Sequence, residues 1–226
     1  MLSVGIDTST KVGCLAIVED GKCLVEKTID AQLDHSARLL PTLESALEEA
    51  GCTRTDIACI GVGLGPGSLT GVRVGIAFAK GLVFALQKPL VGVCSLEAIA
   101  YRVRESASIV TVIVDAKLGG YYHASYRWAG GTFEEVRAPS VCSLRELPEQ
   151  IAGISLLVSP DEKGIPREVL EGLPRDCRVE ETPVHPSAEY IARRALAEAS
   201  LPSYDPGKIV EPTYLRPGIP QKAKLA

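Results

Sequence analysis

Runs of apolar and β-branched residues alternate with short polar breaks in the first part of the chain. They predict strands at residues 2–7, 12–19, 22–29 and 57–63. The second and third runs are separated by Asp20 and Gly21, a pair that is typical of a tight hairpin turn. The first three strands are therefore expected to be joined by hairpins.

A helical pattern begins after the third strand. From Leu39 onward the apolar residues recur every three or four positions, which predicts a helix at about 35–51 that Gly51 closes. Pro41 lies early in this segment and should loosen its first turn. A glycine-rich loop follows the fourth strand and leads into a second helix at about 70–87. This order of elements suits a mixed sheet that is covered by helices.

The second part of the chain repeats this order in weaker form. Strands are predicted at residues 109–115, 121–127, 132–138 and 154–158, and a helix at 187–200. The first strand of each triplet ends in an aspartate, Asp7 in one and Asp115 in the other. We therefore expect a degenerate structural duplication with its boundary near residues 100–108. From residue 201 onward the chain is rich in proline and should be extended.

Composition narrows the class of protein. The chain has 226 residues, a formal net charge of −4 and seven cysteines. An acidic chain is poorly suited to hold a nucleic acid backbone by itself, because that affinity comes from clustered Lys and Arg. The odd number of cysteines and the lack of a CxxC pair argue against a disulfide framework and a cysteine-rich zinc site. The start of the chain does not resemble a signal peptide, and no long uncharged apolar stretch occurs, so we expect a cytoplasmic protein without a membrane span.

Two segments have the composition of a phosphate-binding site. The first strand ends in Asp7 and runs into a hydroxyl-rich turn of Thr8, Ser9 and Thr10, which can hold a phosphate through backbone N–H groups. The same hydroxyl groups can instead bond to their own backbone. The sequence GLGPGSLTGVRVG at 63–75 places a glycine loop before a helix, another potential anion site, but it lacks the Gly-Lys-Ser/Thr of a Walker loop.

The glycine loop also has a conformational interpretation. Gly65, Gly67 and Gly71 are expected to adopt unusual φ values, and Thr70 is expected to cap the helix that follows. That helix has Arg73 and Lys80 as its only charges, so it should be buried on more than one side. It is either a central core helix or a helix with one face in a subunit interface.

The histidines do not suggest a metal site. His35, His123 and His185 are far apart in the sequence, and none has a second His or Cys three or four residues later. The sequence also lacks a GxSxG elbow and an HExxH pair. We therefore expect no metal and no catalytic residues.

Six segments together carry a resemblance to a known family. They are DTST at 7–10, HSARLLP at 35–41, GLGPGSLTGVRVG at 63–75, PLVGVCSLEAIA at 89–100, VDAKLGGYY at 114–122 and PTYLR at 212–216. In identity and order they resemble the TsaB family, accessory proteins in the synthesis of threonylcarbamoyladenosine in tRNA. The resemblance spans nearly the whole chain. The glycine loop with HSARLLP upstream is specific, whereas DTST or PTYLR by itself is not.

The resemblance implies a fold and a set of partners. The fold would be α/β of the actin-like (ribonuclease H-like) type, with an N-terminal subdomain at 1–104 and a C-terminal subdomain at 105–226. The partners would be the catalytic subunit TsaD, in a heterodimer, and the ATPase TsaE, with tRNA bound only through the complex. A homodimer in the absence of TsaD stays open. In TsaD a His-x-x-x-His motif ligates the metal, and the corresponding positions here are Ser95 and Ile99.

Three functions remain in competition at this point. The resemblance favours a non-catalytic scaffold that binds and activates TsaD. The second is a small ATPase or kinase of the same fold that uses Asp7, Thr8 and Thr10 on phosphate, with ATP or ADP bound. The third is a metallopeptidase, against which the missing metal ligands argue.

Residues for each role follow from these functions. The two predicted helices are expected to form the partner interface through His35, Leu39, Leu43, Leu47, Gly71, Arg73, Val74, Gly75, Phe78 and Ala79. The phosphate or nucleotide site would use Asp7, Thr8, Ser9, Thr10, Gly65 and Gly67. Apart from ATP or ADP, whose binding stays open, no cofactor is expected.

Overall fold

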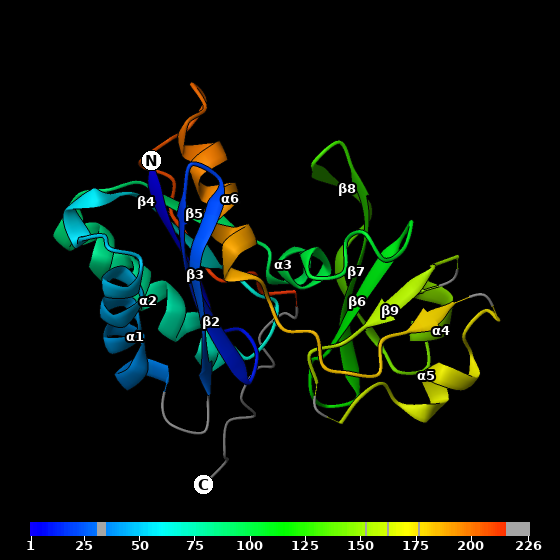
Figure 1. Ribbon diagram of the computed structural model, residues 1–226. Helices are drawn as coiled ribbons and strands as arrows, with labels where there is room; N and C mark the ends of the chain where they lie inside the picture. The colour runs from blue at the N-terminus through cyan, green and yellow to red at the C-terminus, as the bar shows by residue number, and fades with distance from the viewer. Residues whose placement is uncertain (31–34, 152, 162, 176, 216–226) are drawn as a thin grey trace, which may run out of the picture.

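Two five-stranded sheets form the centre of the structure (Figure 1). The computed structural model describes residues 1–30, 35–151, 153–161, 163–175 and 177–215. The first sheet contains β1 (Leu2–Asp7), β2 (Val12–Glu19), β3 (Lys22–Asp30), β4 (Ile57–Gly63) and β5 (Leu90–Val93). The second sheet contains β6 (Val110–Asp115), β7 (Gly120–Ala129), β8 (Thr132–Ser143), β9 (Leu156–Val158) and β10 (Arg178–Val179). The helices are α1 (His35–Glu49), α2 (Leu69–Leu86), α3 (Ser95–Tyr101), α4 (Leu147–Gln150), α5 (Arg167–Glu171) and α6 (Ala188–Ala199), with a 3₁₀ turn at Arg54–Asp56.

The two sheets have the same topology, which confirms the predicted duplication. The strand order is β3-β2-β1-β4-β5 in the first sheet and β8-β7-β6-β9-β10 in the second. In each sheet the first three strands pair antiparallel, and the last two pair parallel. Each half of the chain contains three strands followed by helix, strand, helix, strand and helix.

The predicted strands and long helices lie where the sequence pattern put them. At the hairpin between β2 and β3, Asp20 has φ +47° and Gly21 has φ +79°, as a two-residue turn with a left-handed backbone requires. Strand β8 continues past the predicted end at residue 138 to Ser143, across Pro139. This is possible because β8 is an edge strand, where a missing N–H leaves no ladder bond unmade.

The first sheet is covered on one face by α1 and α2. The buried residues Leu39, Leu43 and Leu47 of α1 pack with Val4 and Ile6 of β1 in one apolar core. Pro41 lies inside α1, which ends at Glu49 before Gly51 with φ +68°. This agrees with the predicted closure of the helix at Gly51.

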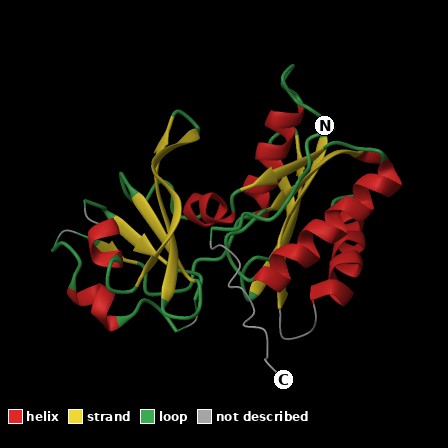
Figure 2. Cartoon of the chain, turned by 180° about the vertical axis from the view of Figure 1, so that it is seen from behind, coloured by secondary structure: helices red, strands yellow, loops and turns green. Residues whose placement is uncertain are grey.

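The other face of the first sheet is covered by α6, which comes from the far end of the chain (Figure 2). A Cβ atom on Gly5 would overlap the Ala188 carbonyl oxygen, and one on Gly61 would lie 2.6 Å from the Ile191 carbonyl oxygen. These two glycines therefore let the backbones of strand and helix meet. In return, α3 of the first half packs on β6 and β7 of the second sheet. The sequence division at 104/105 assigns α6 to the second half, whereas the helix packs on the first sheet.

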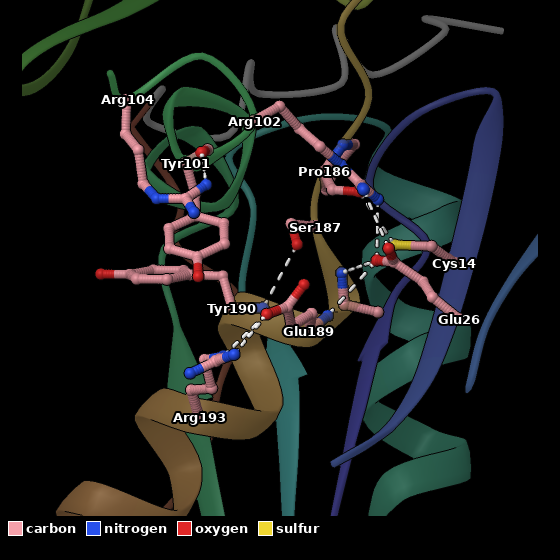
Figure 3. A network of polar contacts seen from close by, with 11 residues as sticks. Cys14, Glu26, Tyr101, Arg102, Arg104, Pro186, Ser187, Glu189, Tyr190 and Arg193 are labelled. Atoms are coloured by element: carbon pink, nitrogen blue, oxygen red, sulfur yellow. Dashed lines mark hydrogen bonds and ion pairs between the residues drawn. The ribbon is translucent and has the colours of Figure 1, made fainter. Parts of the chain in front are cut away.

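A polar network fixes the start of α6 at the junction between the two halves (Figure 3). The Glu26 carboxylate on β3 accepts hydrogen bonds from both terminal nitrogens of Arg102, at 2.7 and 2.8 Å, and from the Ala188 N–H, at 2.8 Å. Arg102 also donates to the Pro186 carbonyl oxygen at 3.2 Å. A carboxylate at a helix N-terminus is favourable because the first N–H groups carry partial positive charge.

Candidate functional site

A cleft lies between the turns that follow the two strand-ending aspartates, Asp7 and Asp115, and Asp115 lines it directly. The cleft has a volume of about 390 Å³ and is bordered by the turn after β1, the N-terminus of α2 and the turn after β6. Ser9, Thr10 and Lys11 line it on one side, and Asp115 and Lys117 on the other. The structure thus brings the turn of the DTST motif after β1 and the turn of the VDAKLGGYY motif after β6 to one cleft.

Asp7 is fully buried behind the turn that lines the cleft, and its carboxylate accepts hydrogen bonds from Ser9 and Ser95. Oδ1 accepts from the Ser9 N–H at 2.7 Å, and Oδ2 accepts from the Ser95 hydroxyl at 2.6 Å. The Ser95 oxygen in turn accepts from the Gly65 N–H at 3.0 Å. Asp7, Ser95 and the glycine loop therefore form one buried chain of hydrogen bonds.

Two of the hydroxyl groups in the turn after β1 donate hydrogen bonds to backbone carbonyl oxygens of the same chain. The Thr8 hydroxyl donates to the Gly71 carbonyl oxygen, and the Thr10 hydroxyl donates to the Val12 carbonyl oxygen, both at 2.7 Å. The Ser9 hydroxyl oxygen is buried and has no hydrogen-bond partner among the described residues. Two of the three side chains thus bond to backbone, as such residues commonly do in turns.

The glycine loop makes close contacts rather than a series of unusual φ values. Only Gly65 has a positive φ, +80°, so the expectation for Gly67 and Gly71 was wrong. A Cβ on Gly67 would overlap the Ser9 carbonyl oxygen, and one on Gly71 would overlap that of Thr8. These two glycines allow the loop and the first turn of α2 to lie against the turn after β1.

The cap of α2 also differs from the expectation. Ser68, not Thr70, is the N-cap, and its hydroxyl accepts from the Gly71 N–H at 3.3 Å. Thr70 lies inside the first turn of the helix. The Ser68 N–H donates to the Ser9 carbonyl oxygen at 2.7 Å, so the same residue joins the helix to the turn after β1.

Asp115 in the second half carries an ion pair instead of the serine contact of Asp7. Its carboxylate accepts from the Lys117 N–H at 2.7 Å and the Lys117 ammonium at 2.8 Å. Partial burial raises the pKa of Asp115, but the hydrogen bonds from Lys117 outweigh it and leave the pKa below its ordinary value. The same hydrogen bond raises the pKa of Lys117. The cleft therefore holds a charged pair on its second side.

The positions that would correspond to metal ligands are buried and occupied by other interactions. Ser95 is in the hydrogen-bond chain with Asp7, and Ile99 is fully buried in the apolar core of the second half. Among the described residues no group of three or more His, Cys, Asp or Glu could hold a metal ion. His123 lies buried on β7 and bonds Ser140 through Nε2 at 2.9 Å.

Most residues expected at a partner interface are buried in the chain itself. Leu39, Leu43, Leu47, Gly71, Gly75 and Ala79 are all buried. A Cβ on Gly75 would overlap the Thr8 hydroxyl oxygen, so the small-residue side of α2 faces the turn after β1, not the outside. The expectation was wrong for this side. Arg73 is exposed, Val74 and Phe78 are half-buried, and the side chain of His35 lies outside the described part of the structure.

The open side of α2 carries exposed apolar residues beside two cations, Arg73 and Lys80, a feature that the sequence did not assign to particular residues. Leu69, Ala77 and Ala85 are exposed there, and Phe84 is 82% exposed. By length and composition α2 could cross a membrane, but its other side packs on β4 and β1 as a core helix does.

The C-terminal segment returns to the exposed N-terminal end of α2. The Thr213 N–H donates to the Leu64 carbonyl oxygen at 2.8 Å, and the Tyr214 hydroxyl accepts from two nitrogens of Arg73, each at 3.2 Å. Thr213 and Tyr214 of the PTYLR motif therefore lie beside the open side of α2. As expected, the described residues from 201 to 215 contain no helix.

Sequence comparisons place these features in a family. Residues 29–160 match the family model described as TsaD: tRNA N6-adenosine threonylcarbamoyltransferase. The chain is 32% identical to the tRNA threonylcarbamoyladenosine biosynthesis protein TsaB of Escherichia coli, over 68% of each chain. It is 33% identical to the protein of the same name from Bacillus subtilis, over 60% of this chain and 59% of that one.

Solved structures agree with the fold. The YeaZ protein of Pseudomonas aeruginosa superposes with a TM-score of 0.76 at 26% identity, over 95% of this chain and 99% of that chain. Component A of the (R)-2-hydroxyglutaryl-CoA dehydratase of Acidaminococcus fermentans superposes with a TM-score of 0.53 at 12% identity and is similar in fold alone. With the duplicated sheets, these similarities confirm the expected actin-like fold.

Proposed function

The chain belongs to the TsaB family of the tRNA threonylcarbamoyladenosine biosynthesis system, and from this membership we propose that it is a non-catalytic subunit that binds and activates a TsaD transferase. TsaE, an ATPase, is the further proposed partner. tRNA would reach the chain only as part of the complex, because a chain with net charge −4 holds a nucleic acid backbone poorly. The complex would act in the cytoplasm.

The single observation that carries the non-catalytic role is the hydrogen bond between Ser95 and Asp7. Ser95 occupies a position that the family resemblance aligns with a metal-ligating histidine of TsaD, yet its hydroxyl bonds a buried aspartate. The second such position, Ile99, has no ligand atom. A site that uses these groups to hold its own loops together supports a structural role more than a catalytic one.

The surface that supports binding is the N-terminal part of the open side of α2, around Leu69 and Ala77. Exposed apolar residues on one side of a helix are stabilised when a partner covers them. Arg73 and Lys80, the only charges on the helix, are exposed on the same side, so a partner must supply polar groups for these two cations. In the absence of TsaD the same side is available to a second copy of the chain.

Reconstitution of tRNA modification tests the function. TsaD, TsaE and this chain should together modify tRNA, whereas omission of the chain should abolish most turnover. The chain by itself should neither modify tRNA nor cleave peptides. Full turnover by TsaD and TsaE without the chain would refute the proposal.

A pair of matched substitutions tests the surface. Ala77→Glu places a charge on the open side of α2, and Ala138→Glu places the same charge on exposed strand β8. Both proteins should fold, since both alanines are exposed, but only Ala77→Glu should weaken TsaD binding in calorimetry. Equal binding by the two variants would place the interface elsewhere.

The cleft favours one alternative, a nucleotide-dependent ATPase or kinase. Hydroxyl groups and lysines line it and can donate hydrogen bonds to a phosphate near Asp7, Thr8 and Thr10, with ATP or ADP as the ligand. ATP turnover by the purified chain that Asp7→Asn abolishes, with the fold intact, would support this alternative. A chain that does not turn over ATP but is required for tRNA modification by TsaD would support the scaffold role instead.

A further inference from the structure

A second groove lies at the other end of α2, away from the cleft. It has a volume of about 710 Å³ and runs between the C-terminal end of α2, the start of β5 and the segment 204–210 that follows α6. The sequence motifs and the proposed catalytic partner leave this groove without a role.

The walls of the groove are fixed by hydrogen bonds and are therefore preformed. The Tyr204 hydroxyl accepts from the Leu90 N–H at 3.1 Å and donates to the Leu90 carbonyl oxygen at 3.2 Å. On the opposite wall, Gln87 ends α2 in a left-handed conformation, with its N–H bonded to the Val83 carbonyl oxygen at 2.8 Å. A ligand would thus lose little free energy in ordering the site.

Two large apolar side chains stand open at the groove. Phe84 is 82% exposed on the α2 wall, and Ile209 is 74% exposed on the tail wall. Val210, next in the chain, is buried beneath the tail wall and anchors it in the core of the first half. Exposed aromatic and aliphatic groups around a fixed hollow are typical of surfaces that bind peptides.

The charge of the groove has one sign. Lys80, Lys88 and Lys208 line it, and none of the described lining residues is Asp or Glu. Of these lysines, Lys208 lies 4.0 Å from a carboxylate oxygen of Glu198, a distance at the limit of an ion pair. A concentration of positive charge in a chain of net charge −4 indicates a ligand with carboxylates.

We propose that this groove binds an acidic peptide segment of a partner protein, in which Asp or Glu residues flank a large apolar side chain. The apolar residue would contact Ile209 and Phe84, and the carboxylates would lie near Lys88 and Lys208. The mixture of aliphatic side chains with only three lysines favours a peptide over a nucleic acid, whose backbone requires a longer row of cations. The C-terminal residues 216–226 contain three cations and no acid, so charge complementarity does not favour them as the ligand.

A peptide display library of random short sequences, selected on the full chain, tests the proposal. The enriched peptides should combine acidic residues with a large apolar residue. Synthetic copies should bind Lys88→Glu and Ile209→Asp at least about tenfold more weakly than the wild type, because each substitution reverses or removes a matched contact. Binding to Lys88→Glu should recover when the peptide's acids are changed to lysine.

Two control variants exclude general effects of charge and surface polarity. Lys22→Glu makes the same charge change on strand β3, and Leu118→Asp makes the same apolar-to-acid change at an exposed turn. Both should bind the peptides like the wild type. Circular dichroism should show that all four variants are folded. The side chains of Lys22, Leu118 and Ile209 are exposed, and that of Lys88 is half-buried.

Several results would overturn the proposal. Selection could yield no peptide that depends on the groove, or peptides without acids. Sedimentation could show self-association that Ile209→Asp abolishes, which would make a second copy the occupant. Labelled tRNA could bind the wild type but not Lys88→Glu, which would make the groove a nucleic acid site. None of these outcomes would affect the proposed binding of TsaD through Ala77 on the open side of α2.

Discussion

Ser95 shows how one residue can change the use of a site. Its hydroxyl donates to the Asp7 carboxylate and accepts from the Gly65 N–H, and all three residues are buried. Buried polar groups cost free energy when they lose a partner, so this serine stabilises both an acid and a loop. The acid at the end of β1 is therefore bound into the packing of the chain.

The residue-scale prediction is that Ser95→Ala destabilises the fold. The substitution leaves the Asp7 carboxylate and the Gly65 N–H with one partner fewer, which typically costs about 1–3 kcal/mol. Urea unfolding would measure the change in the free energy of unfolding. Ser200→Ala, which removes an exposed serine bond to Leu196, should cost less than about 0.5 kcal/mol. Equal losses in the free energy of unfolding for the two variants would show that the buried hydrogen bonds of Ser95 stabilise the fold no more than an exposed one does.

A second residue-scale prediction concerns pH. Burial, with a smaller effect of Arg137, lowers the pKa of His123 below its ordinary value of 6.5. As the pH falls through about 6.5 the unfolded chain therefore takes up a proton at His123 more readily than the folded chain, and the free energy of unfolding decreases. His123→Gln should lose part of this dependence between about pH 7 and 5, a window set by the ordinary His pKa. Parallel curves for the two proteins, measured by urea unfolding, would contradict the assignment.

At the scale of the element, α2 has two sides with different uses. Gly71 and Gly75 lie against the turn after β1, and a Cβ on either would overlap an atom of Thr8. Gly81 is exposed, and a Cβ there would meet nothing within 4 Å. The same residue type thus serves close packing on one side and has no packing role on the other.

This difference predicts opposite effects of one substitution. Gly71→Ala should destabilise the chain by about 1–3 kcal/mol, since it inserts a methyl group into a packed contact. Gly81→Ala should stabilise it by about 0.5–1 kcal/mol, because alanine favours the helix over glycine. Thermal and urea unfolding would give both values. Destabilisation of similar size in both variants would mean that the contact with Thr8 is not the cause.

Long elements could be predicted from the sequence because each presents several periods of its pattern. Strands β1 to β4 of the first sheet, α1, α2 and α6 lie where they were predicted, and the Asp20-Gly21 turn followed from its chemistry. The elements that were missed are short, from the two residues of β10 to the seven of α3. Such lengths contain too little pattern to separate strand from helix. Their position depends on packing against the rest of the fold.

The sequence could not predict which side of α2 faces inward, for a similar reason. A helix that is apolar all round carries no signal of which side is buried. Gly71 and Gly75 were expected at a partner interface, but their neighbour is the chain's own Thr8. The hydrogen bond between Ser95 and Asp7 joins residues 88 positions apart, so no local pattern could reveal it.

At the scale of the whole molecule, the two halves exchange helices. Helix α6 of the second repeat covers the first sheet, and α3 of the first repeat covers part of the second. Tyr101 of α3 and Tyr190 of α6 pack with ring centroids 4.6 Å apart, which joins the exchanged helices to each other. Each half therefore depends on the other to bury its apolar surface, although sequence repetition alone suggests two independent units.

The exchange predicts that the molecule unfolds as one cooperative unit. Gly61→Ala would place a Cβ 2.6 Å from the Ile191 carbonyl oxygen and so weaken the docking of α6 on the first sheet, by about 1–3 kcal/mol. Trp128, the single tryptophan, lies on β7 and packs edge-on against Tyr101 of α3, with ring centroids 5.6 Å apart, so its fluorescence reports on the second sheet and the helix docked on it. If the halves are coupled, the substitution in the first sheet should lower the urea midpoint of Trp128 fluorescence and of circular dichroism by the same amount. A fluorescence midpoint that stays at the wild-type value while the dichroism midpoint falls would mean that the second half folds independently, and that the helix exchange joins the halves without coupling their stability.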